Sequence, residues 1–267
     1  MLTSDRSRLS GRTPDARDNC MQTVNYDLVA PGYDRRYERN RFDGVRAVLH
    51  RFVDSALGAP VAEVGCGTGH WLADLSDGGF RPLVGLDLSS GMLQQAQAAA
   101  PNARLVRGAA NKLPWADDSL DRVFCVNALH HFADQQAFVS ECRRVLRPGG
   151  GLLTIGLDPH AGVDHWWIYD FFPAAVHADR LRYASTVKIR DWLTASGFRE
   201  PVTQVAQHLS VAIPFETARR QGFVDRRAAS QLMVISDDDY ETGMARLLTE
   251  QPVLRADLRL YATSAWT

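Results

Sequence analysis

Short apolar runs alternate with amphipathic segments along the first part of this chain. The strand candidates are four to six residues long and centre on apolar residues, although arginines flank Leu105 and Val106 in one of them; they cover residues 61–64, 83–86, 104–107, 121–126 and 151–156. The amphipathic segments repeat apolar side chains every three or four residues, as helices do; they cover residues 45–57, 70–76, 90–99 and 136–146. Strands alternating with helices predict βαβ units, and therefore an α/β fold whose sheet is mainly parallel.

The helix boundaries and the second half of the chain are less regular. Ser89 or Ser90 is expected to cap the helix that runs to Ala99. Pro148-Gly-Gly150 is expected to close the helix at 136–146. Beyond these, the pattern predicts helices at 190–196 and 239–249, strand-like alternation at 202–211 and an apolar run at 231–234. It leaves open whether the chain after Phe215 completes the sheet or forms part of a lid.

Residues 164–172 are unusually aromatic, with five aromatic side chains and a histidine in nine positions. Such density suits the wall of an apolar pocket; the alternative is a helix whose rings fill core. We expect a lid insert near 158–188. The candidate substrate contacts are Tyr33, His165, Trp166, Tyr169, Phe172 and Tyr183.

Composition narrows the class of protein. The formal net charge is −1 and the only lysines are Lys112 and Lys188, so the sequence shows no concentrated basic face of the kind nucleic-acid binding needs. The four cysteines lack zinc-site spacing, and no metal site is expected. No run reaches the ~18 apolar residues of a membrane helix. We expect a cytoplasmic monomer or homodimer, with a disordered tail at 1–20 and one domain at 21–267.

A glycine-rich loop, Gly65-Cys-Gly-Thr-Gly69, separates the first predicted strand from its helix. Glycines allow a ligand to approach the backbone closely, and the helix N-terminus directs N–H groups at it. Asp87 follows Gly65 by 22 residues, at the end of the next strand, where a carboxylate accepts hydrogen bonds from ribose hydroxyls. The dinucleotide pattern needs glycine at position 70, where this chain has His70. An adenosine-containing ligand is therefore indicated, and a dehydrogenase disfavoured.

Four ordered motifs extend this pattern; they lie at residues 61–71, 83–92, 113–132 and 145–150. Together they resemble class I S-adenosylmethionine-dependent methyltransferases, most closely the small-molecule branch typified by ubiquinone/menaquinone biosynthesis methyltransferases. Residues 26–34 fit the N-terminal helix of that branch, and the resemblance covers about 26–200. It implies S-adenosylmethionine as cofactor. It also implies a Rossmann-like doubly wound sheet of seven mostly parallel strands, helices on both faces, N-terminal cap helices and a helical, aromatic lid.

The resemblance also implies roles by position. Glu63 and the glycine loop surround the amino-acid end of the cofactor, Asp87 holds the ribose, and Leu88 and Met92 pack near the adenine. The implied cofactor-binding residues are Tyr26, Tyr33, Glu63, Gly65, Cys66, Gly67, Gly69, Asp87, Leu88, Met92, Ala109, Ala110, Asn127 and Ala128. Structural alternatives remain open: Glu63 as a helix cap and Met92 as core.

One position departs from the family pattern. The family usually has an acidic residue, which accepts a hydrogen bond from the adenine amino group, where this chain has Ala109. Losing one such neutral bond costs on the order of 1 kcal/mol, so cofactor binding is expected to survive.

The implied reaction is an in-line methyl transfer to an O, N or C atom of a small, aromatic or apolar metabolite, with secondary metabolism as the setting. It requires an acceptor held ~3–3.5 Å from the methyl group and out of water, with a general base only where the acceptor starts protonated. Candidates for that base are His130, His131, His160, His165 and Tyr33, and we expect it among His130, His131 and His165. The alternatives are a cyclisation or elimination on the same fold, and a methyltransferase that acts on RNA or protein.

Overall fold

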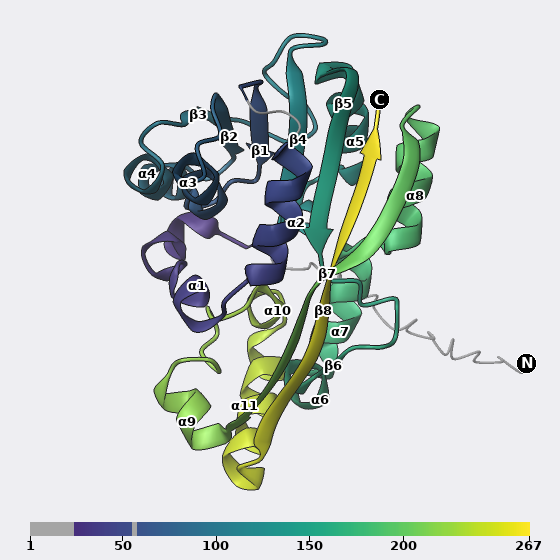
Figure 1. Cartoon of the computed structure of the whole chain (residues 1–267). Coiled ribbons are helices and arrows are strands. Elements are labelled where there is room, and N and C mark those ends of the chain that lie inside the picture. The colour runs from purple at the N-terminus through teal and green to yellow at the C-terminus, as the bar shows by residue number, and fades with distance from the viewer. Residues whose placement is uncertain (1–23, 55–57) are drawn as a thin grey trace, which may run out of the picture.

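The computed structural model describes residues 24–54 and 58–267; the predicted tail at 1–20 lies outside them. Its centre is one sheet in the order β3-β2-β1-β4-β5-β8-β6, with β7 paired to β8 (Figure 1). The strands are β1 Val61–Val64, β2 Leu83–Asp87, β3 Arg104–Arg107, β4 Leu120–Val126, β5 Leu146–Gly156, β6 His165–Trp166, β7 Arg199–Pro214 and β8 Val253–Trp266.

The first five strands pair in parallel, in the order β3-β2-β1-β4-β5. Strand β8 runs antiparallel to β5, β6 and β7. The Rossmann-like, mostly parallel α/β fold is thereby confirmed. The described part of the chain contains eight strands instead of the expected seven, because the two-residue β6 pairs with the lower half of the long β8.

Helices cover both faces of the sheet and also build a separate lower body (Figure 1). The 3-10 helices are η1 Tyr26–Leu28, η2 Ala30–Gly32 and η3 Leu129–His131. The α-helices are α1 Arg35–Arg39, α2 Asp43–Asp54, α3 His70–Asp77, α4 Ser90–Ala99, α5 Gln135–Val145, α6 Trp167–Phe171, α7 Pro173–Arg182, α8 Thr186–Ala195, α9 Phe215–Arg220, α10 Ser230–Met233 and α11 Asp237–Glu250.

Three apolar clusters hold these layers together. Buried side chains of α2 and α3 pack on one face of the sheet, and those of α5 and α8 on the other. The third cluster joins α6, α9, α10 and α11 to the start of β8. The α6–α7 and α9–α11 segments therefore form a helical lid with its own core below the carboxyl ends of β1 and β4 (Figure 1).

Local sequence explains most element boundaries. Ser89, rather than Ser90, caps α4, because its hydroxyl accepts a hydrogen bond from Met92 N at 3.1 Å. The expected closure of α5 by Pro148-Gly-Gly150 is wrong. The helix ends at Val145, and β5 begins at once with a register shift opposite β4 that takes up the Pro-Gly-Gly segment.

The chain after Phe215 does both things that its sequence left open. Helices α9 to α11 belong to the lid, while β8 returns to the sheet between β5 and β7. The strand carries a two-residue period in which Leu254, Leu258, Leu260 and Ala262 are buried. That alternation is the ordinary signal of a half-buried strand.

Candidate functional site

The glycine loop lies between β1 and α3 and is tightly held. Gly65, Gly67 and Gly69 have φ angles of 73°, 52° and 80°, a region that favours glycine. A Cβ on Gly65 would lie 2.5 Å from Ala128 Cβ, and a Cβ on Gly69 would lie 3.0 Å from the backbone of Ala96 in α4. The loop therefore sits directly against the end of β4 and against α4, and only glycine fits its closest approach.

Asp87, at the end of β2, faces this loop. Its Oδ2 accepts a hydrogen bond from Gly67 N at 2.8 Å, and its Oδ1 accepts one from Ser89 N at 2.9 Å. Burial raises the pKa of this carboxyl, and the two backbone bonds partly offset that rise. Because a carboxylate accepts up to about four hydrogen bonds, Asp87 keeps capacity for two hydroxyl donors such as those of a ribose.

Glu63 lies on β1 beneath the loop, and it is 1% exposed. Its Oε2 has no hydrogen-bond partner among the described residues. Burial raises the pKa of Glu63 well above its usual value, and the nearby Asp87 adds to the rise. The structure gives Glu63 no role as a helix cap, since Gly69 precedes α3 without a side-chain cap. A buried carboxylate without a donor fits the amino group at the amino-acid end of S-adenosylmethionine.

The N-terminal segment from η1 to α1 covers the loop. The Asp27 carboxylate accepts hydrogen bonds from Gly91 N at 2.8 Å and from the Ser89 hydroxyl at 2.6 Å. The Thr68 hydroxyl donates a hydrogen bond to Asp34. The Tyr33 ring lies over Gly67, with its Cε1 3.9 Å from a Cβ built on that glycine. This cap segment is thus attached to both the loop and the start of α4.

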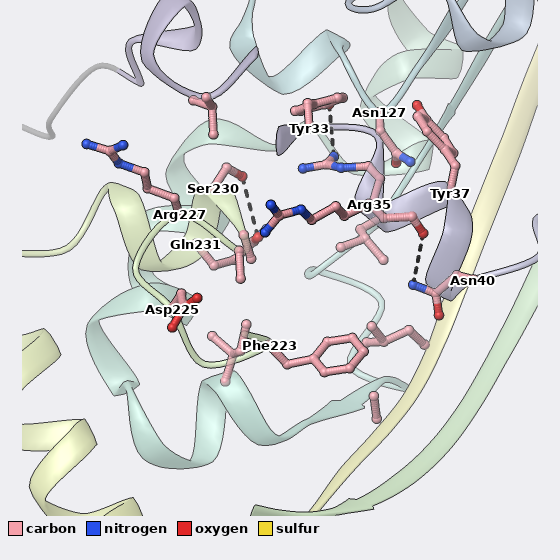
Figure 2. Close-up of a pocket in the computed structure, with 18 of the residues that line it drawn as sticks. Tyr33, Arg35, Tyr37, Asn40, Asn127, Phe223, Asp225, Arg227, Ser230 and Gln231 are labelled. Atoms are coloured by element: carbon pink, nitrogen blue, oxygen red, sulfur yellow. Dashed lines mark hydrogen bonds between the residues drawn. The ribbon is translucent and has the colours of Figure 1, made fainter. Parts of the chain in front are cut away.

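A cavity of about 860 Å³ lies between the cap segment, the end of β4 and the lid (Figure 2). Asn127, with φ of 50°, ends β4 and lines the cavity, and its neighbour Ala128 contacts the Gly65 position. The wall of the cavity at Asn127 is therefore one residue away from the side chain that packs against the glycine loop. Its aromatic and imidazole lining comes from Tyr26, Tyr33, Tyr37, Phe42, Trp71, His130, His131, Trp166, Trp167, Tyr183 and Phe223.

The structure separates the residues expected near the adenine. Leu88 follows β2 and is 66% exposed, whereas Met92 lies in α4 and is 1% exposed, like a residue of the core. Ala109 is exposed and Ala110 is buried. Cys66 is buried in the loop, and burial raises the pKa of its thiol, as suits a small loop residue.

Three of the expected acceptor contacts do not line the cavity, which corrects that part of the prediction. His165 is exposed, with Nε2 at 3.2 Å from the Asp170 carboxylate. The Tyr169 hydroxyl donates to Asp179 at 2.7 Å. Phe172 is completely buried in the lid core. The aromatic segment is thus divided: Trp166 belongs to the cavity wall, and Phe172 to the core.

This division predicts different effects for two substitutions. Trp166→Ala is expected to raise KM for the acceptor about tenfold or more, since a cavity ring contributes apolar contact, with a small effect on folding. Phe172→Ala is expected to lower the free energy of unfolding by about 3–5 kcal/mol. Steady-state kinetics and urea denaturation measure the two effects. An acceptor KM unchanged by Trp166→Ala would contradict the position of this wall.

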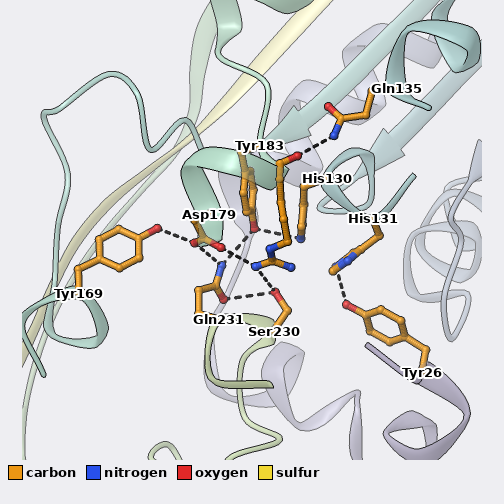
Figure 3. Close-up of polar contacts among 10 residues, drawn as sticks. Tyr26, His130, His131, Gln135, Tyr169, Asp179, Tyr183, Ser230 and Gln231 are labelled. Atoms are coloured by element: carbon orange, nitrogen blue, oxygen red, sulfur yellow. Dashed lines mark hydrogen bonds and ion pairs between the residues drawn. The ribbon is translucent and has the colours of Figure 1, made fainter. Parts of the chain in front are cut away.

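His130 and His131 lie at the cavity end of η3 (Figure 3). His130 Nε2 is 3.0 Å from the Tyr183 hydroxyl, with the two rings stacked at 3.9 Å. His131 Nε2 is 2.5 Å from the Tyr26 hydroxyl. Burial lowers the pKa of both imidazoles, and the guanidinium groups of Arg182 and Arg36 lower it further, for His131 to about 3. Both rings are therefore neutral at neutral pH.

The low pKa of His131 has a consequence for stability. Because the pKa falls from 6.5 to about 3 on folding, the unfolded chain binds a proton that the folded chain does not. The free energy of unfolding should therefore fall as the pH decreases through this window, by up to about 1.4 kcal/mol per pH unit from this residue. His131→Gln should make that decrease shallower in urea denaturation series. His177→Gln, exposed on α7, is the control, and equal slopes for both variants would contradict the prediction.

Some residues around the cavity escaped the sequence interpretation. Arg36, Phe223 and Gln231 all line it, and they come from the cap and from the lid segment near α10. Arg36 carries one local signal, since it follows Tyr33 by three residues and its guanidinium stacks on that ring at 3.6 Å. Phe223 and Gln231 carry none, because only the folded lid brings them to the site.

The described residues contain neither a group of metal ligands nor a membrane-spanning helix. Within residues 24–54 and 58–267, no three His, Cys, Asp or Glu side chains are grouped so as to hold a metal ion. In the same ranges, no helix has both the length and the apolar character needed to cross a bilayer.

Comparison with known proteins agrees with this geometry. Residues 62–154 match the methyltransferase domain family. A demethylmenaquinone methyltransferase of Beutenbergia cavernae is 35% identical over 128 residues, which is 48% of this chain and 50% of that protein. A methyltransferase assigned to an antibiotic biosynthesis pathway of Anabaena variabilis has a TM-score of 0.65 at 19% identity, covering 83% of this chain and 96% of that one.

A second similar structure contains the expected cofactor. Haemonchus contortus phosphoethanolamine N-methyltransferase 2, in complex with S-adenosyl-L-methionine, has a TM-score of 0.61 at 17% identity, covering 91% of this chain and 60% of that one. The region of residues 62–154 is therefore similar to methyltransferase domains, including domains of S-adenosylmethionine-dependent enzymes. The chain spans 41% and 50% of the length of two curated relatives that it matches.

Proposed function

We propose that this chain transfers the methyl group of S-adenosylmethionine to an O, N or C atom of a small aromatic or apolar molecule bound in the cavity. The observation that carries the proposal is the position of Asn127, which lines the cavity and directly precedes Ala128, the residue packed against Gly65 of the glycine loop. The cavity volume of about 860 Å³ is in the range that encloses a small organic ligand. A polymer such as RNA or a protein chain would need an open cleft instead.

The chain's own residues have separate tasks in this proposal. S-adenosylmethionine supplies an activated methyl group on a sulfonium. Glu63, the glycine loop and Asp87 bind and orient the cofactor, while the cap segment and the lid exclude water. Tyr183 and Trp166 pack against the acceptor. Most of the acceleration then comes from alignment in a closed site.

His130 and His131 are the candidates for a general base. Both line the cavity and both are neutral, so each can accept a proton. A pKa near 3 for His131 makes it a weak base unless a nearby negative charge raises that pKa. His165, exposed on β6 and outside the cavity, is not part of the proposal.

The test uses deuterium-labelled S-adenosylmethionine with three acceptor pools: a small-molecule extract, total RNA and a protein fraction. Mass spectrometry should detect the labelled methyl group in the small-molecule pool. Label only in RNA or protein would contradict the proposal, and turnover without label transfer would indicate cyclisation or elimination. Once the acceptor is known, full activity in both His130→Ala and His131→Ala would exclude these histidines as the base.

A further inference from the structure

The lining of the cavity has an excess of positive charge. Its charged side chains are Arg35, Arg36, Arg226, Arg227 and the single carboxylate of Asp225; three of them are labelled in Figure 2. Only Arg226 has a carboxylate partner among the described residues, since it lies 3.1 Å from Asp237. This local excess contrasts with the formal net charge of −1 for the whole chain, and a cleft with one sign of charge attracts ligands of the other.

Arg36 is the most enclosed of these cations. Its Nη1 donates to the Tyr33 hydroxyl at 2.9 Å, and its guanidinium covers the Tyr33 ring. Its Nε is buried and has no acceptor among the described residues. No described carboxylate forms an ion pair with Arg36. A guanidinium in this position is costly to bury unless a negative charge joins it.

Arg182 adds a second positive charge behind the cavity wall. It bonds the Ser230 hydroxyl at 3.5 Å, and its guanidinium lies 5.7 Å from the Tyr183 ring; both residues line the cavity. Its side chain is 9% exposed, and its Nη2 pairs with Asp179 at 2.5 Å. Its Nε and Nη1 are buried without acceptors in the described part of the chain.

The Asp179 carboxylate does not serve Arg182 alone. Its Oδ2 also accepts hydrogen bonds from the Tyr169 hydroxyl at 2.7 Å and from Gln231 Nε2 at 2.9 Å (Figure 3). The positive charges of Arg182 and Arg36 both act on His131, since each of them lowers the pKa of that imidazole. The guanidinium of Arg36 thus lines the cavity and that of Arg182 lies behind its wall, and both have buried N–H groups without an acceptor among the described residues.

We propose that the acceptor is an apolar acid whose carboxylate is bound by Arg36 at the inner end of the cavity. This inference rests on the proposed function and specifies its substrate class. Arg182 supports the carboxylate from behind Ser230 and Tyr183, and the exposed Arg35 and Arg227 attract the acid to the entrance. The apolar part of the acceptor packs on Trp166 and Phe223. The bound carboxylate also supplies the negative charge that makes the neighbouring His131 a better base.

The test measures binding without turnover. Calorimetric titrations with 2-naphthoate and with the neutral isostere 2-naphthamide are run on the whole chain saturated with S-adenosylhomocysteine. The acid should bind at least tenfold more tightly than the amide, and Arg36→Gln should weaken acid binding about 10- to 100-fold, the usual size for a charged hydrogen bond. Arg36→Lys should retain part of the preference. Arg180→Gln, exposed on α7, is the matched control and should retain all of it.

Equal binding of acid and amide, or no binding of the acid, would overturn the inference. A second carboxylate source is the cofactor itself. If Arg36→Gln weakens S-adenosylhomocysteine but not 5′-methylthioadenosine, which lacks the amino-acid end, Arg36 serves the cofactor and the inference is overturned. Failure of S-adenosylhomocysteine to bind the unaltered chain would instead reject the proposed function, so the two failures are distinguishable.

Discussion

Gly65→Ala should abolish useful cofactor binding, with a loss of affinity on the order of 100-fold or more. The new Cβ would lie 2.5 Å from Ala128 Cβ, at a φ of 73°. The left-handed backbone costs about 1–2 kcal/mol and the overpacking about 1–3 kcal/mol. Relief of the clash must move either the loop or the end of β4, and both belong to the site. Calorimetry with S-adenosylhomocysteine and urea denaturation measure the two effects.

Gly79→Ala is the control that separates the cost of backbone strain from an effect on the cofactor site. Gly79 has a φ of 86°, but a Cβ there meets nothing within 4 Å. We expect it to lower the free energy of unfolding by about 1–2 kcal/mol and to leave cofactor affinity unchanged. If Gly65→Ala binds the cofactor as well as Gly79→Ala does, the loop is not the cofactor cradle.

Asp87→Asn should weaken S-adenosylhomocysteine binding on the order of 100-fold, because hydrogen bonds to a charged partner are the costly ones to lose. Both carboxylate oxygens accept backbone N–H groups, from Gly67 and Ser89. An asparagine has only one acceptor oxygen. Its amide nitrogen must oppose one of those N–H groups and cannot accept from a ribose hydroxyl.

Asp77→Asn provides the control for this change. Asp77 ends α3, is exposed and has no ion pair in the described part of the chain. Its substitution should leave the calorimetric affinity as it is. An Asp87→Asn variant with the same affinity as Asp77→Asn would contradict the ribose site.

The sequence was most informative where local chemistry determines structure. The predicted ranges 61–64 and 104–107 match β1 and β3. For β1 the reason is a short, fully buried segment between turn signals, which leaves little choice of boundary. The sequence also placed the glycine loop and Asp87 together, because the carboxyl ends of neighbouring strands in a parallel sheet lie at one edge.

The sequence was least informative about contacts between distant segments. Residues 164–172 form one aromatic run, yet Trp166 lines the cavity while Phe172 packs against Tyr240 with centroids 5.8 Å apart. Which ring faces inward depends on α11, whose Tyr240 follows Phe172 by 68 residues, as the Phe172–Tyr240 contact shows. That Arg36 has no carboxylate partner among the described residues likewise becomes visible only in the fold.

The most direct test of the central claim is a crystal structure of the chain with S-adenosylhomocysteine. We expect the ribose hydroxyls on Asp87, the amino group near Glu63, and the sulfur beside Asn127 with an open path into the cavity. A ligand bound outside the glycine loop, or a sulfur separated from the cavity by Tyr26 and His131, would contradict a methyl transfer from this loop to an acceptor in this cavity.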